Sequence, residues 1–172
     1  MKELYKEWGN SMEAAYEEEY FDLIQEYCQY KSGSVDKREA RGRTFHAGYE
    51  MYIYAFFLGL YIDIRTELKG PKKAGFRMPM NSWGYTAQRD RDPYPDIQKY
   101  IFAALVAKTD IDLIAIDKGE VTVETGVKML MKTLQEYANT GFKAIMGKLN
   151  EAPDYFRNEE NFFNFIMQYA RG

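Results

Sequence analysis

The stretch RTFHAGYEMYIYAFFLGLYIDIRTEL, residues 43–68, is the most apolar and aromatic run of the chain. No charged side chain interrupts it between residues 51 and 62. This pattern predicts a central helix over about residues 44–67 that is buried on nearly every side. Gly48 and Gly59 fall inside this helix, where each costs about 1 kcal/mol relative to alanine. We therefore expect another backbone to approach closely at these glycines.

Apolar stripes with helical spacing flank the central helix on both sides along the chain. We expect further helices over residues 11–31, 97–108 and 122–149, and a final helix that Asn158 caps. Residues 109–119 fit a short helix or a strand, and their capping residues favour a helix. The predicted fold is therefore all-α: a single compact domain over residues 1–172, with five to six helices around a buried, aromatic-rich central helix.

The composition is that of a globular protein that builds its own core. Hydrophobic residues make up 46% of the 172 residues and charged residues 28%. Cys28 is the only cysteine, so no intramolecular disulfide forms, which fits a reducing compartment. The uncharged run 51–62 is shorter than the roughly 20 residues that a membrane helix needs. We expect a cytoplasmic protein that does not enter a membrane.

Residues 69–95 differ in kind, because glycines and prolines interrupt every helical pattern there. A long irregular loop of this length inside a compact domain is often functional. Residues 65–99 carry eight basic and four acidic side chains, although the whole chain has a net charge of −3. The loop thus suits an anionic partner, either a nucleic acid or an acidic protein. The alternative is that its cations pair with the acidic ends of the chain or with a second subunit.

The candidate binding residues of this loop combine positive charge with aromatic rings and are Arg77, Trp83, Tyr85, Arg89 and Arg91. Outside the loop, His46 and Glu50 are spaced four residues apart on the predicted central helix. This spacing places both side chains on one face, and we interpret them as a buried, hydrogen-bonded polar pair. One histidine and one cysteine do not make a usual zinc site, so we expect no metal and no cofactor.

Two segments together resemble a known group of proteins: EARGRTFHAGYEMYIYAFFLGLYIDIRTEL (39–68) and KYIFAALVAKTDIDLIAIDKGEVTVETGVKMLMKTLQEYANTGF (99–142). The group consists of small bacterial all-helical proteins of uncharacterised activity, some of which carry the label glycoside hydrolase family 15. That label implies a catalytic glutamate pair, whose sequence context this chain does not contain. The helix ending in GLYIDIRTEL is also similar to small proteins that accompany Dnd-type DNA phosphorothioation systems. Neither resemblance assigns a functional residue here.

Three functions are consistent with these features. We expect first a non-enzymatic interaction or accessory protein that uses the basic and aromatic loop 69–95. The alternatives are a nucleic-acid-associated accessory of a defence or DNA-modification system, and a small glycan-acting hydrolase that uses paired carboxylates. The carboxylates that cluster around one turn are Asp110, Asp112, Asp117 and Glu120. We also expect a homodimer, because tyrosines and phenylalanines on the terminal helices offer more apolar surface than one monomer needs.

Overall fold

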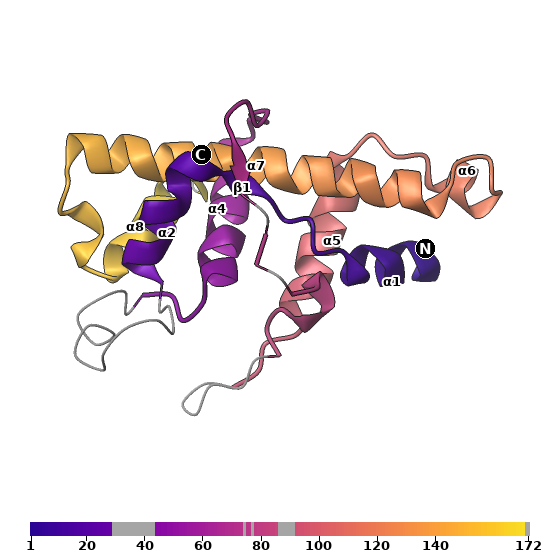
Figure 1. The fold of residues 1–172 in the computed structure, drawn as a ribbon, viewed down its shortest axis with the longest axis horizontal. Coiled ribbons are helices and arrows are strands. Elements are labelled where there is room, and N and C mark those ends of the chain that lie inside the picture. Colours follow the sequence, from indigo (N-terminus) through magenta and orange to yellow (C-terminus); the bar gives the residue numbers. More distant parts are fainter. Residues whose placement is uncertain (29–43, 74, 77, 86–91, 171–172) are drawn as a thin grey trace. The chain divides into compact units, whose positions relative to one another are not determined.

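The computed structural model describes residues 1–28, 44–73, 75–76, 78–85 and 92–170. These residues form seven α-helices and one antiparallel pair of two-residue strands, so the fold is all-α, as predicted (Figure 1). No helix in these ranges has both the length and the hydrophobicity needed to cross a bilayer. The elements are α1 (Lys2–Asn10), β1 (Tyr16–Glu17), α2 (Phe21–Tyr27), α4 (Gly48–Ile62), β2 (Lys72–Lys73), α5 (Ile97–Lys108), α6 (Leu113–Asp117), α7 (Val123–Glu151) and α8 (Glu160–Ala170).

By its contacts the chain divides into two compact units. Unit 1 comprises Met1–Ala15 and Ala74–Leu134, and unit 2 comprises Tyr16–Lys73 and Gln135–Gly172. The long helix α7 contributes its first part to unit 1 and its second part to unit 2. The predicted central helix, α4, belongs to unit 2, whereas the predicted helix 97–108, α5, belongs to unit 1. That residues 1–172 form a single domain stays a prediction.

In unit 1, helix α1 packs against α5 through aromatic rings. Phe102 lies 5.0 Å from Tyr5 and 5.4 Å from Trp8, measured between ring centroids. The 3-10 turn Met80–Ser82 joins this cluster, because the Met80 N–H donates to the Ser11 carbonyl oxygen at 3.0 Å. Helix α5 buries only one of its faces, although its centre is apolar all round. Its outward positions include small alanines, which leave little apolar area in water.

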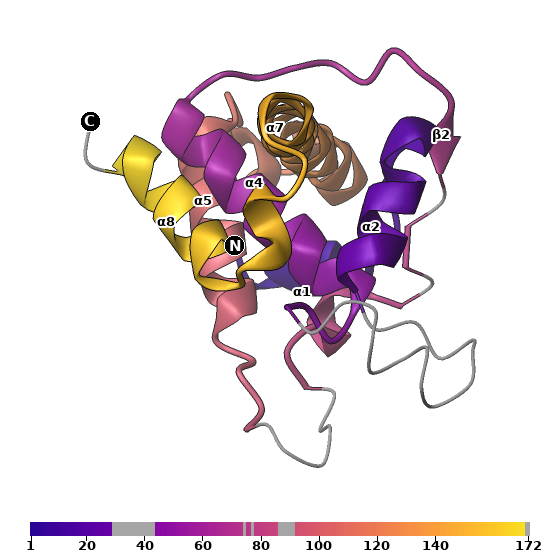
Figure 2. The same ribbon diagram turned by 90° about the vertical axis from the view of Figure 1, so that its left-hand side faces the viewer.

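In unit 2, helix α4 lies between α2 and α8 (Figure 2). Most of its residues are buried, and its largest exposed side chain is Tyr61, so the predicted buried central helix is confirmed. Phe142 of α7 contacts the rings of Tyr16, Tyr20 and Tyr52 at 5.0–6.2 Å between centroids. A second aromatic cluster joins α2 to α8 through Tyr27, Phe156 and Phe162.

Helices α4 and α7 cross at two glycines, one from each helix. A Cβ atom on Gly59 would overlap the carbonyl oxygen of Tyr137, and a Cβ atom on Gly141 would overlap the carbonyl oxygen of Ala55. The two backbones are therefore in direct contact, which only glycine permits at these positions. The predicted close approach at Gly59 is confirmed, and its partner is α7.

Three predicted helix boundaries are wrong, of which the first is the start of the central helix, at Gly48 rather than near residue 44. The helix expected over residues 11–31 begins only at Phe21, because Tyr16 and Glu17 pair with Lys73 and Lys72 as an antiparallel ladder. The central helix ends at Ile62 rather than near residue 67, because Asp63 adopts a left-handed conformation with φ of 57°. Local periodicity does not report either tertiary contact or such a turn.

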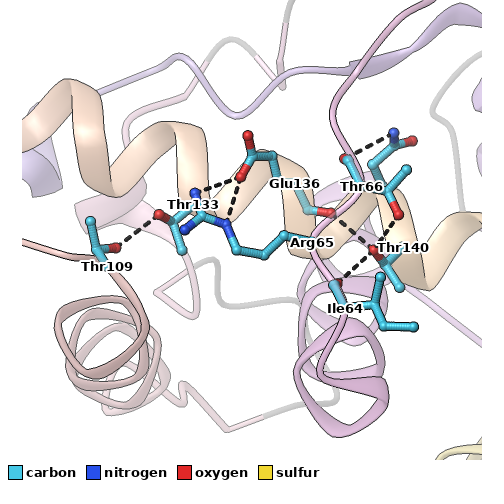
Figure 3. Close-up of polar contacts among 8 residues, drawn as sticks. Ile64, Arg65, Thr66, Thr109, Thr133, Glu136 and Thr140 are labelled. Carbon is cyan, nitrogen blue, oxygen red and sulfur yellow. Dashed lines mark hydrogen bonds and ion pairs between the residues drawn. The ribbon is translucent and has the colours of Figure 1, made fainter.

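The segment after α4 is held against α7 by polar side chains (Figure 3). Arg65 Nε donates to Glu136 Oε2 at 2.7 Å, and the Thr140 hydroxyl donates to the Ile64 carbonyl oxygen at 2.8 Å. The Thr66 N–H donates to the Glu136 carbonyl oxygen at 3.2 Å. These bonds take the place of a helical ladder and hold residues 64–66 along α7.

Glu17 is a carboxylate that unit 2 buries and surrounds with hydrogen-bond donors. Its Oε1 atom accepts from the Lys69 N–H at 2.9 Å and from Asn139 Nδ2 at 3.1 Å. Burial by itself raises the pKa of Glu17, but the hydrogen bonds from Lys69, Asn139 and Gly70 outweigh it and hold that pKa below its usual value. The charged carboxylate thus ties β1, the 69–70 turn and α7 together.

We predict that Gly59→Ala lowers the free energy of unfolding by about 3 kcal/mol, because the added methyl group forces α4 away from the α7 backbone. Gly147→Ala is the matched control, since a Cβ atom at this α7 position meets nothing within 4 Å. It should stabilise the helix by about 0.5–1 kcal/mol. Urea unfolding followed by circular dichroism measures both. Equal effects of the two substitutions would contradict the close backbone contact.

We predict that the stability of the native chain falls as the pH drops through the lowered pKa of Glu17. The unfolded chain binds this proton at a higher pH than the folded chain does, so stability is present above the unfolded pKa and lost below the folded one. Glu17→Gln removes this contribution. Urea unfolding at pH values from about 7 to about 3.5 should therefore show a smaller acid-induced loss in Glu17→Gln than in the native chain. Glu120→Gln, at an exposed carboxylate, should behave like the native chain.

Candidate binding surface

The structure places the predicted loop residues in different settings. Arg77, Arg89 and Arg91 lie outside the described residues. Trp83 is only 1% exposed, and its ring meets Phe76 edge-on at 6.1 Å between centroids. Its carbonyl oxygen accepts from Gln98 Nε2 at 2.7 Å. The Trp83 ring is therefore part of the core of unit 1 and does not present a face on which a ligand could stack.

Tyr85, by contrast, lies on the surface with 60% of its area exposed. Gly84, just before it, has a left-handed φ of 82°, a conformation that glycine adopts without strain. The Tyr94 N–H donates to the Gly84 carbonyl oxygen at 2.8 Å. This bond brings together the two ends of the segment 85–93 and sets Tyr85 near the start of α5.

The start of α5 adds a lysine and a second exposed tyrosine to Tyr85. Tyr100 is 65% exposed, and the side chain of Lys99 is 72% exposed. Lys99 Nζ pairs with Asp96 Oδ1 at 2.7 Å, and this bond raises the pKa of Lys99. Tyr5 and Tyr85 raise the pKa of Lys99 slightly further. We call this set, formed by Tyr5, Tyr85, Asp96, Lys99 and Tyr100, the Tyr85 surface.

Sequence reasoning found only part of the Tyr85 surface. The irregular loop points to Tyr85, whereas Tyr100 sits in the largely apolar stretch 97–108, which gives no sign that it is exposed. The signal that could have located it is the spacing of Asp96, Lys99 and Tyr100. Positions i, i+3 and i+4 share one face of a helix, and two of these three side chains are charged.

His46 and Glu50 interact, but not as the predicted buried side-chain pair. Both residues are half-buried, and the Glu50 Oε2 atom accepts from the backbone N–H of His46 at 2.8 Å. Helix α4 begins at Gly48, so His46 precedes the helix and Glu50 lies in its first turn. The carboxylate thus satisfies a backbone donor at the helix start, as in a capping box. Sequence spacing identified the pair but not the atom that donates.

Two of the four clustered carboxylates have structural partners in unit 1. Asp112 Oδ1 accepts from the Ala115 N–H at 2.9 Å and so caps helix α6. Asp117 Oδ1 pairs with the amino group of Met1 at 3.0 Å. The short helix favoured for residues 109–119 is confirmed as α6, although Asp112 rather than an earlier residue caps it. These bonds give Asp112 and Asp117 structural roles in unit 1.

Cys28 is 1% exposed, and burial raises the pKa of its thiol, with a further contribution from Glu50. A buried thiol with a raised pKa is a poor nucleophile, because the reactive thiolate is disfavoured. Among the residues whose placement is described, no three His, Cys, Asp or Glu side chains gather as metal ligands do. The most exposed polar and aromatic grouping described above is therefore the Tyr85 surface.

Comparisons with protein-family models, with curated protein sequences and with solved structures returned no match to this chain.

We predict that Glu50→Ala lowers the free energy of unfolding by at least about 1 kcal/mol, because the His46 N–H loses its acceptor at the start of α4. His46→Ala is the matched variant, since it keeps the backbone N–H and therefore the bond. His46→Ala should lower the free energy of unfolding clearly less than Glu50→Ala does. Thermal or urea unfolding compares the two variants. A His46→Ala variant as unstable as Glu50→Ala would show that the imidazole, and not the backbone, carries the interaction.

Proposed function

We propose that this chain is a non-enzymatic interaction protein that binds an anionic partner through the Tyr85 surface. The observation that carries the proposal is the exposure of Tyr85 and Tyr100, at 60% and 65%, beside a lysine that is 72% exposed. Tyrosine is enriched in protein interfaces, since its rigid ring gives a large contact area at a small entropy cost and its hydroxyl accepts water or a partner.

The charge of this region supports an anionic partner. Residues 65–99 have a net charge of +4, from eight basic and four acidic side chains, within a chain of net charge −3, but four of the basic residues (Arg65, Lys69, Lys72 and Lys73) belong to unit 2 and not to the unit of Tyr85. Lys99 shares its charge with Asp96 but stays exposed, so a phosphate or carboxylate of a partner has access to the ammonium. Because Asp96 balances the charge of Lys99, we expect an anion to be held by a short contact to the exposed ammonium rather than by a net positive charge of the surface.

Single-stranded nucleic acid is the second candidate function, and the two exposed tyrosine rings favour it. Bases stack on exposed aromatic rings, and each such contact contributes about 1–3 kcal/mol. A neighbouring ammonium neutralises the phosphate between stacked bases. An accessory role in a DNA-modification or defence system would use such a surface, whereas an acidic protein would use the same lysine without stacking.

The test is fluorescence anisotropy with labelled oligonucleotides of about 20 nucleotides, one of DNA and one of RNA, and with a labelled polyglutamate peptide. We expect binding by the native chain that weakens steeply between about 50 and 200 mM salt. The double substitution Tyr85→Ala and Tyr100→Ala should weaken oligonucleotide binding at least about tenfold, which corresponds to about 1.4 kcal/mol. Lys99→Gln should lower the slope of the salt dependence by about one.

Ile114→Ala is the matched control, because Ile114 is also in unit 1 and is 67% exposed, yet lies outside the Tyr85 surface. It should leave every affinity unchanged. Binding of oligonucleotides but not of polyglutamate selects the nucleic-acid candidate, and the reverse selects an acidic protein. No binding to any probe, or binding that the tyrosine substitutions leave intact, contradicts the proposal.

A further inference from the structure

Helix α8 has two apolar faces, of which unit 2 covers one. Phe162 and Phe165 are each 4% exposed and pack into the aromatic cluster around Phe156. The Tyr54 hydroxyl also donates to the Phe162 carbonyl oxygen at 2.7 Å, which fixes α8 on α4. This buried face accounts for the attachment of α8 to its own unit.

The second apolar face of α8 lies on the surface. Phe163 is 64% exposed, and Ile166 and Met167 are half-buried. With Ala170 they follow the spacing i, i+3, i+4 and i+7, which forms one stripe along a helix. We call these four residues the α8 stripe. Among the described residues of unit 2, the other large exposed apolar side chains are Tyr61 of α4 at 52%, Ile64 at 57% and Tyr169 of α8 at 39%.

The charge of α8 indicates which partner fits the stripe. Residues 161–170 contain no charged side chain, although the chain as a whole has a net charge of −3. An interface with two-fold symmetry sets a surface against its own copy, so any single-sign charge on that surface would repel itself. The uncharged stretch 161–170 avoids this repulsion, and the only charge within α8 is Glu160 in its first turn, outside the stripe.

The polar residues beside the stripe can also form hydrogen bonds with the same residues of a second copy. Asn161, Asn164 and Gln168 carry amide groups, each of which both donates and accepts hydrogen bonds. The same residue on two copies can therefore pair with itself. Two α8 helices that cross in opposite directions would in addition bring opposite ends of their helix dipoles together.

We propose that the α8 stripe is the interface through which two copies of this chain associate. The inference goes beyond the proposed function, because the stripe belongs to unit 2 and the Tyr85 surface to unit 1. Helix α8 has 11 residues and is about 16 Å long, so the contact is small for a permanent dimer. The association is accordingly weak and reversible, with a dissociation constant in the micromolar range.

Sedimentation velocity of the full chain, at concentrations from about 1 to about 200 µM, measures this association. We expect a concentration-dependent shift from monomer to dimer in the native chain. Phe163→Glu and Phe163→Lys should each weaken self-association at least about tenfold, because both bury a charge of one sign against its own copy. Phe163 is exposed, so circular dichroism should show both variants folded.

Ile114→Glu is the matched control, because it places the same charge on an equally exposed apolar residue of unit 1. It should dimerise as the native chain does. A native chain that stays monomeric over the whole concentration range overturns the proposal and leaves the stripe to another partner. Dimerisation that survives both Phe163 substitutions, or that Ile114→Glu abolishes equally, overturns it as well.

Discussion

The direct contact between the backbones of α4 and α7 is the constraint on which the arrangement of unit 2 depends. Gly59 and Gly141 each face a carbonyl oxygen of the other helix, so neither position accepts a side chain. A crossing this close leaves no layer of side chains between the helices. The bulky residues of α4 therefore pack to the sides, against α2, α8 and the rest of α7, which explains why so many aromatic rings surround one helix.

The same crossing determines how the chain continues after α4. The helix ends with Asp63 in a left-handed turn, and the next residues follow α7, where Glu136 and Thr140 supply their hydrogen bonds. The buried carboxylate of Glu17 then accepts hydrogen bonds from the backbone of the turn at Lys69 and Gly70. A buried carboxylate is tolerable here only because several donors surround its charge. The polar side chains Glu136 and Thr140 of α7 thus bind the neighbouring segment of the chain instead of facing only solvent.

The two surfaces proposed for function share one physical character, since each exposes aromatic rings that the units do not use for their own cores. The Tyr85 surface adds a lysine to its rings, which favours an anionic partner. The α8 stripe lacks charge, which favours a copy of itself. Charge, rather than hydrophobicity, thus distinguishes the kinds of partner that two aromatic surfaces attract.

The sequence by itself determined the all-α class, the buried helix α4, the bounds of α5, the Asn158 cap of the last helix and the close approach at Gly59, because these depend on local periodicity and residue size. It did not reveal that Trp83 is buried, that residues before Phe21 pair as a strand, or that Tyr100 of the apolar helix α5 is exposed. Those features arise from contacts between residues distant in sequence. Only the tertiary structure decides them, because a side chain's exposure depends on what the rest of the chain places over it.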